Sequence, residues 1–210
     1  MTNGKERYRS ILLLGPTGSG KTPLGKRLES TGLGAKRFVH FDFGAHLRKV
    51  AAAAHPPSVF TASDLDAIRR SLATGALLEN ENFPLALKIL KSFAQEKRLQ
   101  EEDLLVLNGL PRHVGQARDL EPHAAVEAVI FLDSPSEVIW ERIVRNAGGD
   151  RAGRTDDSLA EVQNKCLAFR QRTLPLLDYY VSQSVPILKV PVLVDTTPDD
   201  VLRAIEQKFL

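Results

Sequence analysis

Residues 15–22 read Gly-Pro-Thr-Gly-Ser-Gly-Lys-Thr, a G-x-x-x-x-G-K-T pattern. The pattern directly follows the apolar residues 11–14 and directly precedes a segment of helical periodicity. This context is typical of a P-loop, in which glycines let consecutive backbone N–H groups turn inward around phosphate oxygens. A glycine-rich turn that only joins a strand to a helix is the structural alternative. The pattern and its flanks together predict a phosphate-binding loop in an α/β fold.

The residues of this loop have distinct expected roles. Lys21 would reach the β- and γ-phosphates of a nucleotide, and Thr22 would ligate Mg²⁺ through its hydroxyl. Pro23 would occupy the first helical turn, where its missing N–H costs little. The expected ATP-binding residues are Gly15, Gly18, Ser19, Gly20, Lys21 and Thr22. A P-loop alone does not choose between a GTPase, an ATPase and a small-molecule kinase, but the chain has no N-K-x-D guanine motif.

Short apolar runs alternate with longer segments of helical period, which favours βα units around a mostly parallel sheet. Five strands are expected, at residues 10–14, 37–42, 104–108, 126–133 and 187–195. The expected helices are residues 21–30, 45–53, 62–73, 82–96, 115–120, 136–144, 158–183 and 198–209. The pattern therefore predicts a three-layer α/β fold of the P-loop NTPase type, with a five-stranded parallel sheet and helices on both faces.

Two segments interrupt this rhythm. The chain between the second and third expected strands is too long for one crossover helix, so residues 45–100 are expected to form a small helical insert. Residues 146–157 read N-A-G-G-D-R-A-G-R-T-D-D, a pattern typical of a short mobile loop. Residues 1–44, 101–145 and 158–210 would form the core of a single domain, since one core can hold about 250 residues.

Composition limits the partners and the location. The 210 residues include 28 Lys and Arg against 26 Asp and Glu, a net charge of +2 that indicates neither a nucleic-acid nor a membrane partner. No segment approaches the ~20 apolar residues that span a bilayer. The single cysteine, Cys166, excludes an internal disulfide and fits a reducing compartment, so a cytoplasmic protein is expected. The five histidines show no spacing typical of a metal site.

A second group of residues follows the third expected strand: Asn108-Gly109-Leu110-Pro111-Arg112 and then Gln116. This segment resembles the D-G-F-P-R-x-x-x-Q signature of the adenylate kinase family of nucleoside monophosphate kinases. The likeness extends in order along nearly the whole chain. It covers the family's G-D-x-L-R, its helix before the lid, its R-x-D-D and its T-x-P-L-x-x-Y-Y, which are similar to residues 44–48, 136–142, 154–157 and 173–180.

This resemblance implies an enzyme that transfers the γ-phosphoryl of ATP to a nucleoside monophosphate, AMP by default, with Mg²⁺ as a cofactor and a monomer as the working form. It also implies that residues 45–100 bind the monophosphate (NMP) and that residues 146–157 form a short lid. The implied catalytic residues are Lys21, Arg112, Arg142, Arg154 and Lys165, the last standing where an arginine is usual. The implied NMP-binding residues are Phe43, Gly44, Arg48, Gly109, Arg112 and Gln116, of which Gln116 would read the base. Guanidinium groups suit these roles because their planar fork binds phosphate bidentately.

The expected metal site departs from the family. Family members carry Asp where this chain has Asn108, so a carboxylate that helps hold the water shell of Mg²⁺ is missing. Thr22, at the general P-loop magnesium position, can compensate. Asp42, at the end of the second expected strand, is a further candidate for the metal shell; it is alternatively a helix N-cap. The expected metal residues are thus Thr22, Asn108 through water, and Asp42.

Two other functions stay open at this stage. A kinase of a small hydroxylated metabolite could use Asp42 as its base, although the L-P-R-x-x-x-Q segment argues against it. A catalytically weak, nucleotide-binding regulatory protein would explain Asn108 and the altered acceptor segment at residues 42–45. Lys21 and the set of arginines argue against that reading. The identity of the acceptor is open, because Phe43 replaces the Thr that approaches the base in the family.

Overall fold

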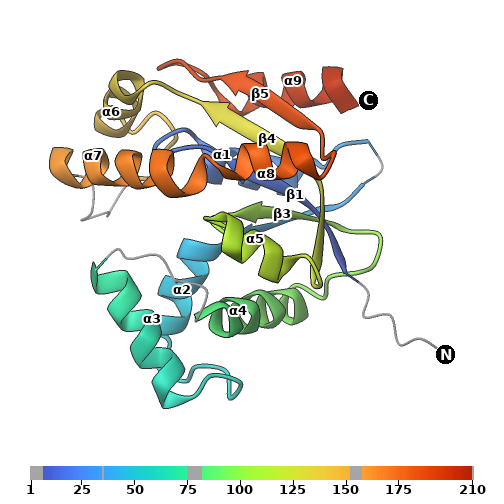
Figure 1. Ribbon diagram of the computed structural model, residues 1–210, viewed down its shortest axis with the longest axis vertical. Helices are drawn as coiled ribbons and strands as arrows, with labels where there is room; N and C mark the ends of the chain where they lie inside the picture. The colour runs from blue at the N-terminus through green and yellow to red at the C-terminus, as the bar shows by residue number, and fades with distance from the viewer. Residues whose placement is uncertain (1–6, 35, 75–81, 152–157, 210) are drawn as a thin grey trace.

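Five parallel strands form one sheet in the computed structural model, which describes residues 7–34, 36–74, 82–151 and 158–209. The strand order is β2-β3-β1-β4-β5, and each neighbouring pair is parallel (Figure 1). The strands are β1 (Tyr8–Leu14), β2 (Phe38–Asp42), β3 (Leu104–Asn108), β4 (Ala124–Asp133) and β5 (Ile187–Pro191). The predicted five-stranded parallel sheet is confirmed.

Helices cover both faces of this sheet (Figure 1). They are α1 (Lys21–Thr31), α2 (Phe43–Ala52), α3 (Ala62–Thr74), α4 (Phe83–Glu96), α5 (Val114–Leu120), α6 (Ser136–Val144), α7 (Leu159–Ala168), η2 (Phe169–Thr173), α8 (Leu176–Ser182) and α9 (Pro198–Phe209). Among the described residues, no helix combines the length and the apolar character that a membrane span requires.

The strands bury side chains on both faces, because successive residues of a strand point to opposite sides. Leu12 and Leu14 of β1 belong to the core cluster that contains the apolar residues of α2, α4 and α5. Ile11 and Leu13 belong to the opposite cluster, with residues of α1 and α9. This division explains why the strands read as continuous apolar runs rather than as an alternating pattern.

Two expected boundaries are wrong, at the last strand and in the long helix. β5 ends at Pro191 instead of residue 195, because the chain turns where Thr196 Oγ1 accepts the Leu193 N–H at 2.9 Å. The helix expected at residues 158–183 is divided into α7, the π-helical segment η2 and α8. Pro175 has no N–H to continue the helical hydrogen bonds, so the helix breaks before α8. η2 is also where Thr173 Oγ1 donates to the Arg112 carbonyl at 2.8 Å.

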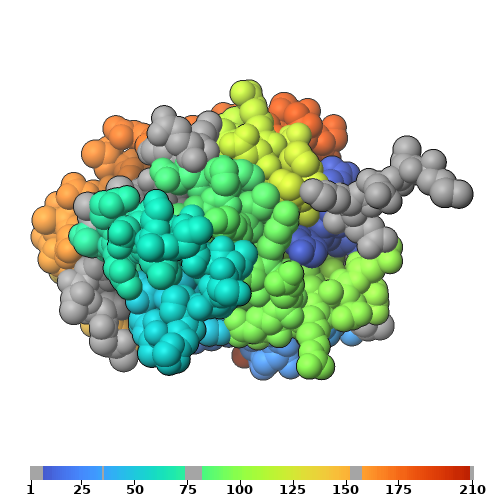
Figure 2. Space-filling view, turned by 90° about the horizontal axis from the view of Figure 1, so that it is seen from below, coloured from blue at the N-terminus to red at the C-terminus, as the bar shows by residue number. Residues whose placement is uncertain are grey.

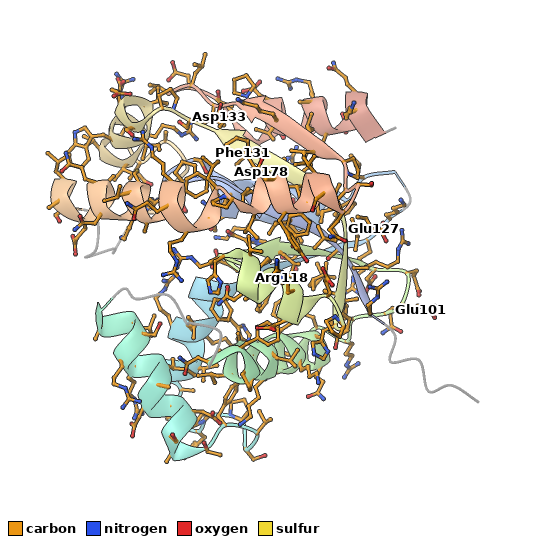
Figure 3. All side chains as sticks on the ribbon, in the orientation of Figure 1. Glu101, Arg118, Glu127, Phe131, Asp133 and Asp178 are labelled. Atoms are coloured by element: carbon orange, nitrogen blue, oxygen red, sulfur yellow. The ribbon has the colours of Figure 1, made fainter. Side chains whose placement is uncertain are left out.

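The carboxyl ends of the strands share one edge of the sheet. Figure 3 labels Glu127 and Asp133 toward opposite ends of β4, and Asp133 is the carboxyl end. α2, α3 and α4 lie in the chain between β2 and β3, at the lower end of the molecule in Figure 1, and together they form much of the surface seen from below in Figure 2. The loops that follow β1, β2 and β3 therefore meet at the edge where parallel α/β sheets bind their ligands.

Candidate active site

The P-loop has the backbone that its glycines predict. Gly18 and Gly20 have φ values of +77° and +97°, in the left-handed region that favours glycine. Gly15 lies against the end of β4, since an added Cβ there would stand 2.8 Å from the Leu132 carbonyl oxygen. Gly20 is the N-cap of α1. The buried hydroxyl of Ser19 donates to the Pro16 carbonyl at 2.9 Å, so this side chain holds the loop in shape.

Lys21 folds back over its own loop. Its Nζ donates to the carbonyls of Gly15 and Pro16, each at 2.6 Å. Burial lowers the pKa of Lys21 to about 7, with further lowering by the charges of Arg112 and Arg151 and opposition from Asp42 and Asp150. The side chain therefore stands among cations in a partly dehydrated site. A bound phosphate would restore its full charge.

Thr22, Asp42 and Asn108 form one hydrogen-bonded group beside the P-loop. Asp42 and Asn108 are register partners at the ends of β2 and β3. The Thr22 hydroxyl donates to Asp42 Oδ2 at 2.6 Å, and Asn108 Nδ2 donates to Thr22 Oγ1 and to Asp42 Oδ2, both at 3.1 Å. The structure thus brings the three expected metal residues together. Asn108 acts as a hydrogen-bond donor that orients Thr22 and Asp42.

Asp42 also serves as a helix cap, as its alternative interpretation proposed. Its Oδ1 accepts the Ala45 N–H at 2.8 Å at the start of α2, while Oδ2 faces Thr22. One carboxylate and one hydroxyl next to a phosphate cradle fit Mg²⁺, which is usually held by one or two carboxylates, substrate phosphates and water. Within the described ranges no group of three or more His, Cys, Asp or Glu side chains could hold a metal by itself.

His40 lies behind this group and fills the space over α1. Its ring is buried, and its Nε2 lies 3.4 Å from Asn108 Nδ2. An added Cβ at Gly25 would stand 2.2 Å from the His40 ring, so the close approach of α1 to β2 requires glycine there. Burial lowers the pKa of His40, which keeps the imidazole neutral beside Asn108.

Two of the expected acceptor arginines face the same region. At the start of α2, an added Cβ on Gly44 would lie 3.6 Å from both Arg48 Nη1 and Asp42 Oδ1, so Gly44 leaves room beside these two groups. Arg112 carries an exposed side chain that is crowded enough for burial to lower its pKa to about 10, which leaves it charged at neutral pH. Its effect on Lys21 shows that the two charges lie within electrostatic reach.

The backbone of Arg112 is held from two sides. Its N–H donates to Gln116 Oε1 at 2.8 Å, and its carbonyl accepts from Thr173. Gln116 is 1% exposed, and its hydrogen bond to the Arg112 N–H positions the loop that begins at Gly109 (φ +86°). A role for Gln116 in reading the acceptor base stays a prediction.

Phe43 has a packing role. Its side chain is buried in the core cluster, with its ring 6.0 Å from that of Phe41. A contact between Phe43 and an acceptor base stays a prediction.

Arg142 contacts the P-loop from α6. Its Nε donates to the Gly18 carbonyl at 3.1 Å, and its Nη1 donates to the carbonyls of Leu193 and Val194 at 2.7 Å and of Thr196 at 3.0 Å. Burial lowers its pKa, whereas Asp150 and Asp195 act in the opposite direction. These contacts tie the P-loop to the turn after β5. Phosphate binding by Arg142 stays a prediction.

Lys165 and Arg154 are the two remaining catalytic candidates. Lys165 is half-buried on α7. Arg154 lies outside the described residues, together with the rest of residues 152–157, so the structure describes only the first half of the expected lid.

Sequence reasoning missed Arg151. Its Nη2 donates to Thr17 Oγ1 of the P-loop at 3.0 Å, and its charge contributes to the lowered pKa of Lys21. The available signal was its place in the glycine- and arginine-containing loop, but the family pattern directed attention to Arg154. Only folding of the loop shows that Arg151 contacts the P-loop, and the role expected of Arg154 stays a prediction.

Comparisons with known proteins identify relatives of this chain. A family model described as an AAA domain matches residues 14–163. The adenylate kinase of Synechococcus sp. (strain WH7803) is 31% identical over 183 residues, covering 84% of this chain and 87% of that protein. The adenylate kinase of Xanthomonas campestris pv. campestris (strain B100) is 31% identical over 178 residues, covering 81% and 84%.

A solved structure shows the same fold at lower sequence identity. The unliganded sugar kinase from Janibacter sp. HTCC2649 superposes with a TM-score of 0.53 at 15% identity, covering 94% of this chain and 92% of that one. Sequence relatives, fold and P-loop geometry agree on a kinase that transfers phosphoryl groups from a nucleotide. The chain belongs to the adenylate kinase family of P-loop kinases.

Proposed function

We propose that this protein transfers the γ-phosphoryl of ATP to a nucleoside monophosphate, with AMP as the first acceptor to test and Mg²⁺ as cofactor. The observation that carries the proposal is the grouping of Lys21, Arg112 and Arg48 around the Thr22–Asp42–Asn108 group at one edge of the sheet. Three cations beside a carboxylate and a hydroxyl suit two phosphate groups and one hydrated divalent ion.

The donor side is the P-loop. Its backbone N–H groups and the N-terminus of α1 would hold the donor phosphates, with Lys21 at the β- and γ-phosphates. Thr22 and Asp42 would hold Mg²⁺, which would neutralise charge on the donor phosphates. Asn108 would keep both oxygens oriented through the hydrogen bonds that its Nδ2 donates.

The acceptor side is the region between Arg48 and Arg112. We infer that residues 45–100, which contain most of α2 together with α3 and α4, act as the acceptor-binding insert, and that residues 146–157 act as a lid. Arg48 and Arg112 would grip the acceptor phosphate bidentately and align one of its oxygens with the γ-phosphorus. A phosphate oxygen is already ionised at neutral pH, so the transfer needs alignment and charge neutralisation rather than a base.

The contacts of Asp42 weigh against the rival metabolite kinase. A base for a hydroxyl acceptor needs a carboxylate oxygen aimed at the acceptor, whereas Oδ1 of Asp42 caps α2 and Oδ2 faces Thr22 and Asn108, where the proposed Mg²⁺ would bind. The likeness to the sugar kinase shows the fold alone.

The experiment is a coupled assay of ADP release with ATP and each of AMP, GMP, CMP, UMP and dTMP as acceptor. One monophosphate should support turnover well above the rate of ATP hydrolysis by water, and Lys21→Met should abolish it while the protein still folds. A panel of small hydroxylated acids and sugars run in parallel tests the rival. Turnover with one of those, and with no monophosphate, would replace the proposed function.

A further inference from the structure

The loop after α6 is closed into a turn by Asn146. This residue has a φ of +48°, a conformation that Asn tolerates better than most residues. Its carbonyl accepts the Gly149 N–H at 2.9 Å, and its side-chain Oδ1 accepts the Arg151 N–H at 3.0 Å. Asn146 therefore fixes the backbone at Arg151, five residues further along the chain.

The turn is packed against the start of α1. An added Cβ at Gly148 would stand 3.0 Å from Pro23 Cγ, so the turn rests on the residue that directly follows Thr22. Glycine at this position allows that close approach. The loop after α6 and the P-loop consequently meet through Gly148 and Pro23 as well as through Arg151.

The Arg151 side chain lies at the P-loop. Only 9% of its surface is exposed, its Nη2 donates to Thr17 Oγ1 at 3.0 Å, and Asp150 Oδ1 lies 3.9 Å from its Nε. Lys21 Nζ is bound to the carbonyls of Gly15 and Pro16, the two residues before Thr17. The guanidinium of Arg151 and the ammonium of Lys21 therefore both contact residues 15–17, the first part of the P-loop.

This grouping of cations is unfavourable without an anion. The Arg151 guanidinium is hydrogen-bonded to Thr17, and the Lys21 ammonium is hydrogen-bonded to Gly15 and Pro16, so two positive charges share one short stretch of the P-loop. Burial near a like charge is favourable only when an anion neutralises the group. Arg151 reaches the P-loop from the loop after α6, whereas Lys21 begins α1.

We propose that Arg151 is a catalytic residue that contacts the phosphoryl group in transfer, and that Asn146 is its positioning residue. The inference rests on the proposed phosphoryl transfer. In that step the bond between the γ-phosphorus and the β,γ-bridging oxygen breaks, and a bond forms from an oxygen of the acceptor phosphate. The electron pair of the broken bond stays on the β-phosphate. Arg151 would neutralise the charge on the equatorial oxygens, as an arginine supplied in cis does in other P-loop enzymes.

The first test compares Arg151→Ala with a matched control in the same segment. Arg145→Ala removes an exposed guanidinium that pairs with Glu141 on α6. Arg151→Ala should lower kcat about 10²- to 10³-fold with little change in the KM for ATP, because the lost contact forms with the transferring group. Arg151→Lys should recover part of kcat, and Arg145→Ala should match the wild type. A kcat for Arg151→Ala within threefold of the wild type would overturn the proposal.

The second test separates catalysis from support of the loop. Aluminium fluoride completes a mimic of the transferring phosphoryl beside ADP, so ADP should bind more tightly to the wild type when fluoride and aluminium are added. Arg151→Ala should bind ADP as the wild type does but lose this tightening. Equal loss of affinity for ADP with and without aluminium fluoride would assign Arg151 to support of the P-loop and overturn the catalytic role.

Asn146 provides a test of positioning. Asn146→Ala removes the acceptor of the Arg151 N–H and should lower kcat about tenfold, whereas Asn146→Asp keeps an oxygen there and tolerates a positive φ, so it should retain activity. Equal activity of both variants would contradict the positioning role. If the wild type phosphorylates no monophosphate, the proposed acceptor class fails, but the ADP measurement still reports on Arg151 because it needs no acceptor.

Discussion

At the residue scale, the site depends on charges placed close together before any ligand is present. Lys21 is held against carbonyls of its own loop while Arg112 and Arg151 approach it. Asp42 shares one oxygen with Thr22 and Asn108. The first group is short of negative charge and the second is short of a cation, so a nucleotide with Mg²⁺, as proposed, would complete both at once.

The Lys21 environment predicts a pH-dependent stability. The pKa in the folded protein is about 7, below the ordinary value of 10.5, so between these values the unfolded chain binds more protons. Stability should therefore rise with pH, by on the order of 1 kcal/mol between about pH 7 and 8.5. Lys21→Met should remove this rise. Urea denaturation of both proteins across that range checks it, and parallel profiles would show that Lys21 is not the cause.

The Asp42–Asn108 pair predicts that the metal-shell carboxylate has moved from the end of β3 to the end of β2. Asp42→Asn keeps the helix cap but removes the charge, so the Mg²⁺ needed for half-maximal activity should rise several-fold, if about 1 kcal/mol of metal interaction is lost. The double variant Asp42→Asn with Asn108→Asp returns a carboxylate across the register and should restore the requirement.

Mn²⁺ binding to the ADP complex, followed by electron paramagnetic resonance, gives a readout of this metal site that is independent of turnover. Relative to the wild type, Asn108→Asp alone should lower the Mg²⁺ requirement, since it adds a second carboxylate beside Asp42. A double variant no better than Asp42→Asn would contradict the relocated charge.

At the scale of the elements, short strand–loop–helix units set the distances between site residues. α1 lies so close to β2 that the His40 ring occupies the space of a Cβ at Gly25. η2 replaces regular helix where Thr173 reaches the Arg112 carbonyl. Small local departures from regular structure thus bring the helices to the β3–α5 loop and to the P-loop.

The contact between α1 and β2 predicts a large effect of one methyl group. Gly25→Ala should destabilise the protein by about 1–3 kcal/mol, because the new Cβ would overlap the buried His40 ring. Adding His40→Ala should relieve part of this loss, so the double variant should be less destabilised than the sum of the single variants. Thermal and urea denaturation measure both; strictly additive effects would mean that the two residues do not compete for space.

At the scale of the whole molecule, the site lies where separate parts of the chain converge. Lys21 follows β1, Asp42 ends β2, Arg112 follows β3, and Arg142 and Arg151 come from α6 and the loop after it. α2, which carries the proposed acceptor residue Arg48, lies beside α3 at the lower end of the molecule (Figure 1). Ligand binding across this edge should therefore affect α2 and α3 as well as the P-loop.

Amide hydrogen exchange measures whether ligand binding protects α2 and α3 as well as the P-loop. Diadenosine pentaphosphate, which spans donor and acceptor sites, should slow exchange in α2 and α3, because these helices would close over the acceptor end. A non-hydrolysable ATP analogue should protect the P-loop and leave α3 largely unchanged. α9, on the other face of the sheet, serves as the internal control. Protection of the P-loop alone by the dinucleotide would argue against an acceptor site at α2.

Much of the fold could be predicted from the sequence because its signals are local. The apolar runs matched five parallel strands, and the glycine pattern at residues 15–22 matched a P-loop, since strand burial and glycine conformations are written into neighbouring residues. In residues 158–183, the π-helical segment was missed because it forms where Thr173 contacts the distant Arg112 loop, whereas the break before α8 is marked locally by Pro175.

The arrangement of the site was decided by tertiary structure. Sequence spacing identified Asn108 as a lost charge, but only the pairing of β2 with β3 places Asp42 against it. No sequence pattern singled out Arg151, but the turn at Asn146 carries it to Thr17, and the role expected of Arg154 stays a prediction. Hydrogen bonds and charge interactions act through space between residues more than 60 positions apart, such as Asp42 and Asn108, and no local pattern records which of them meet.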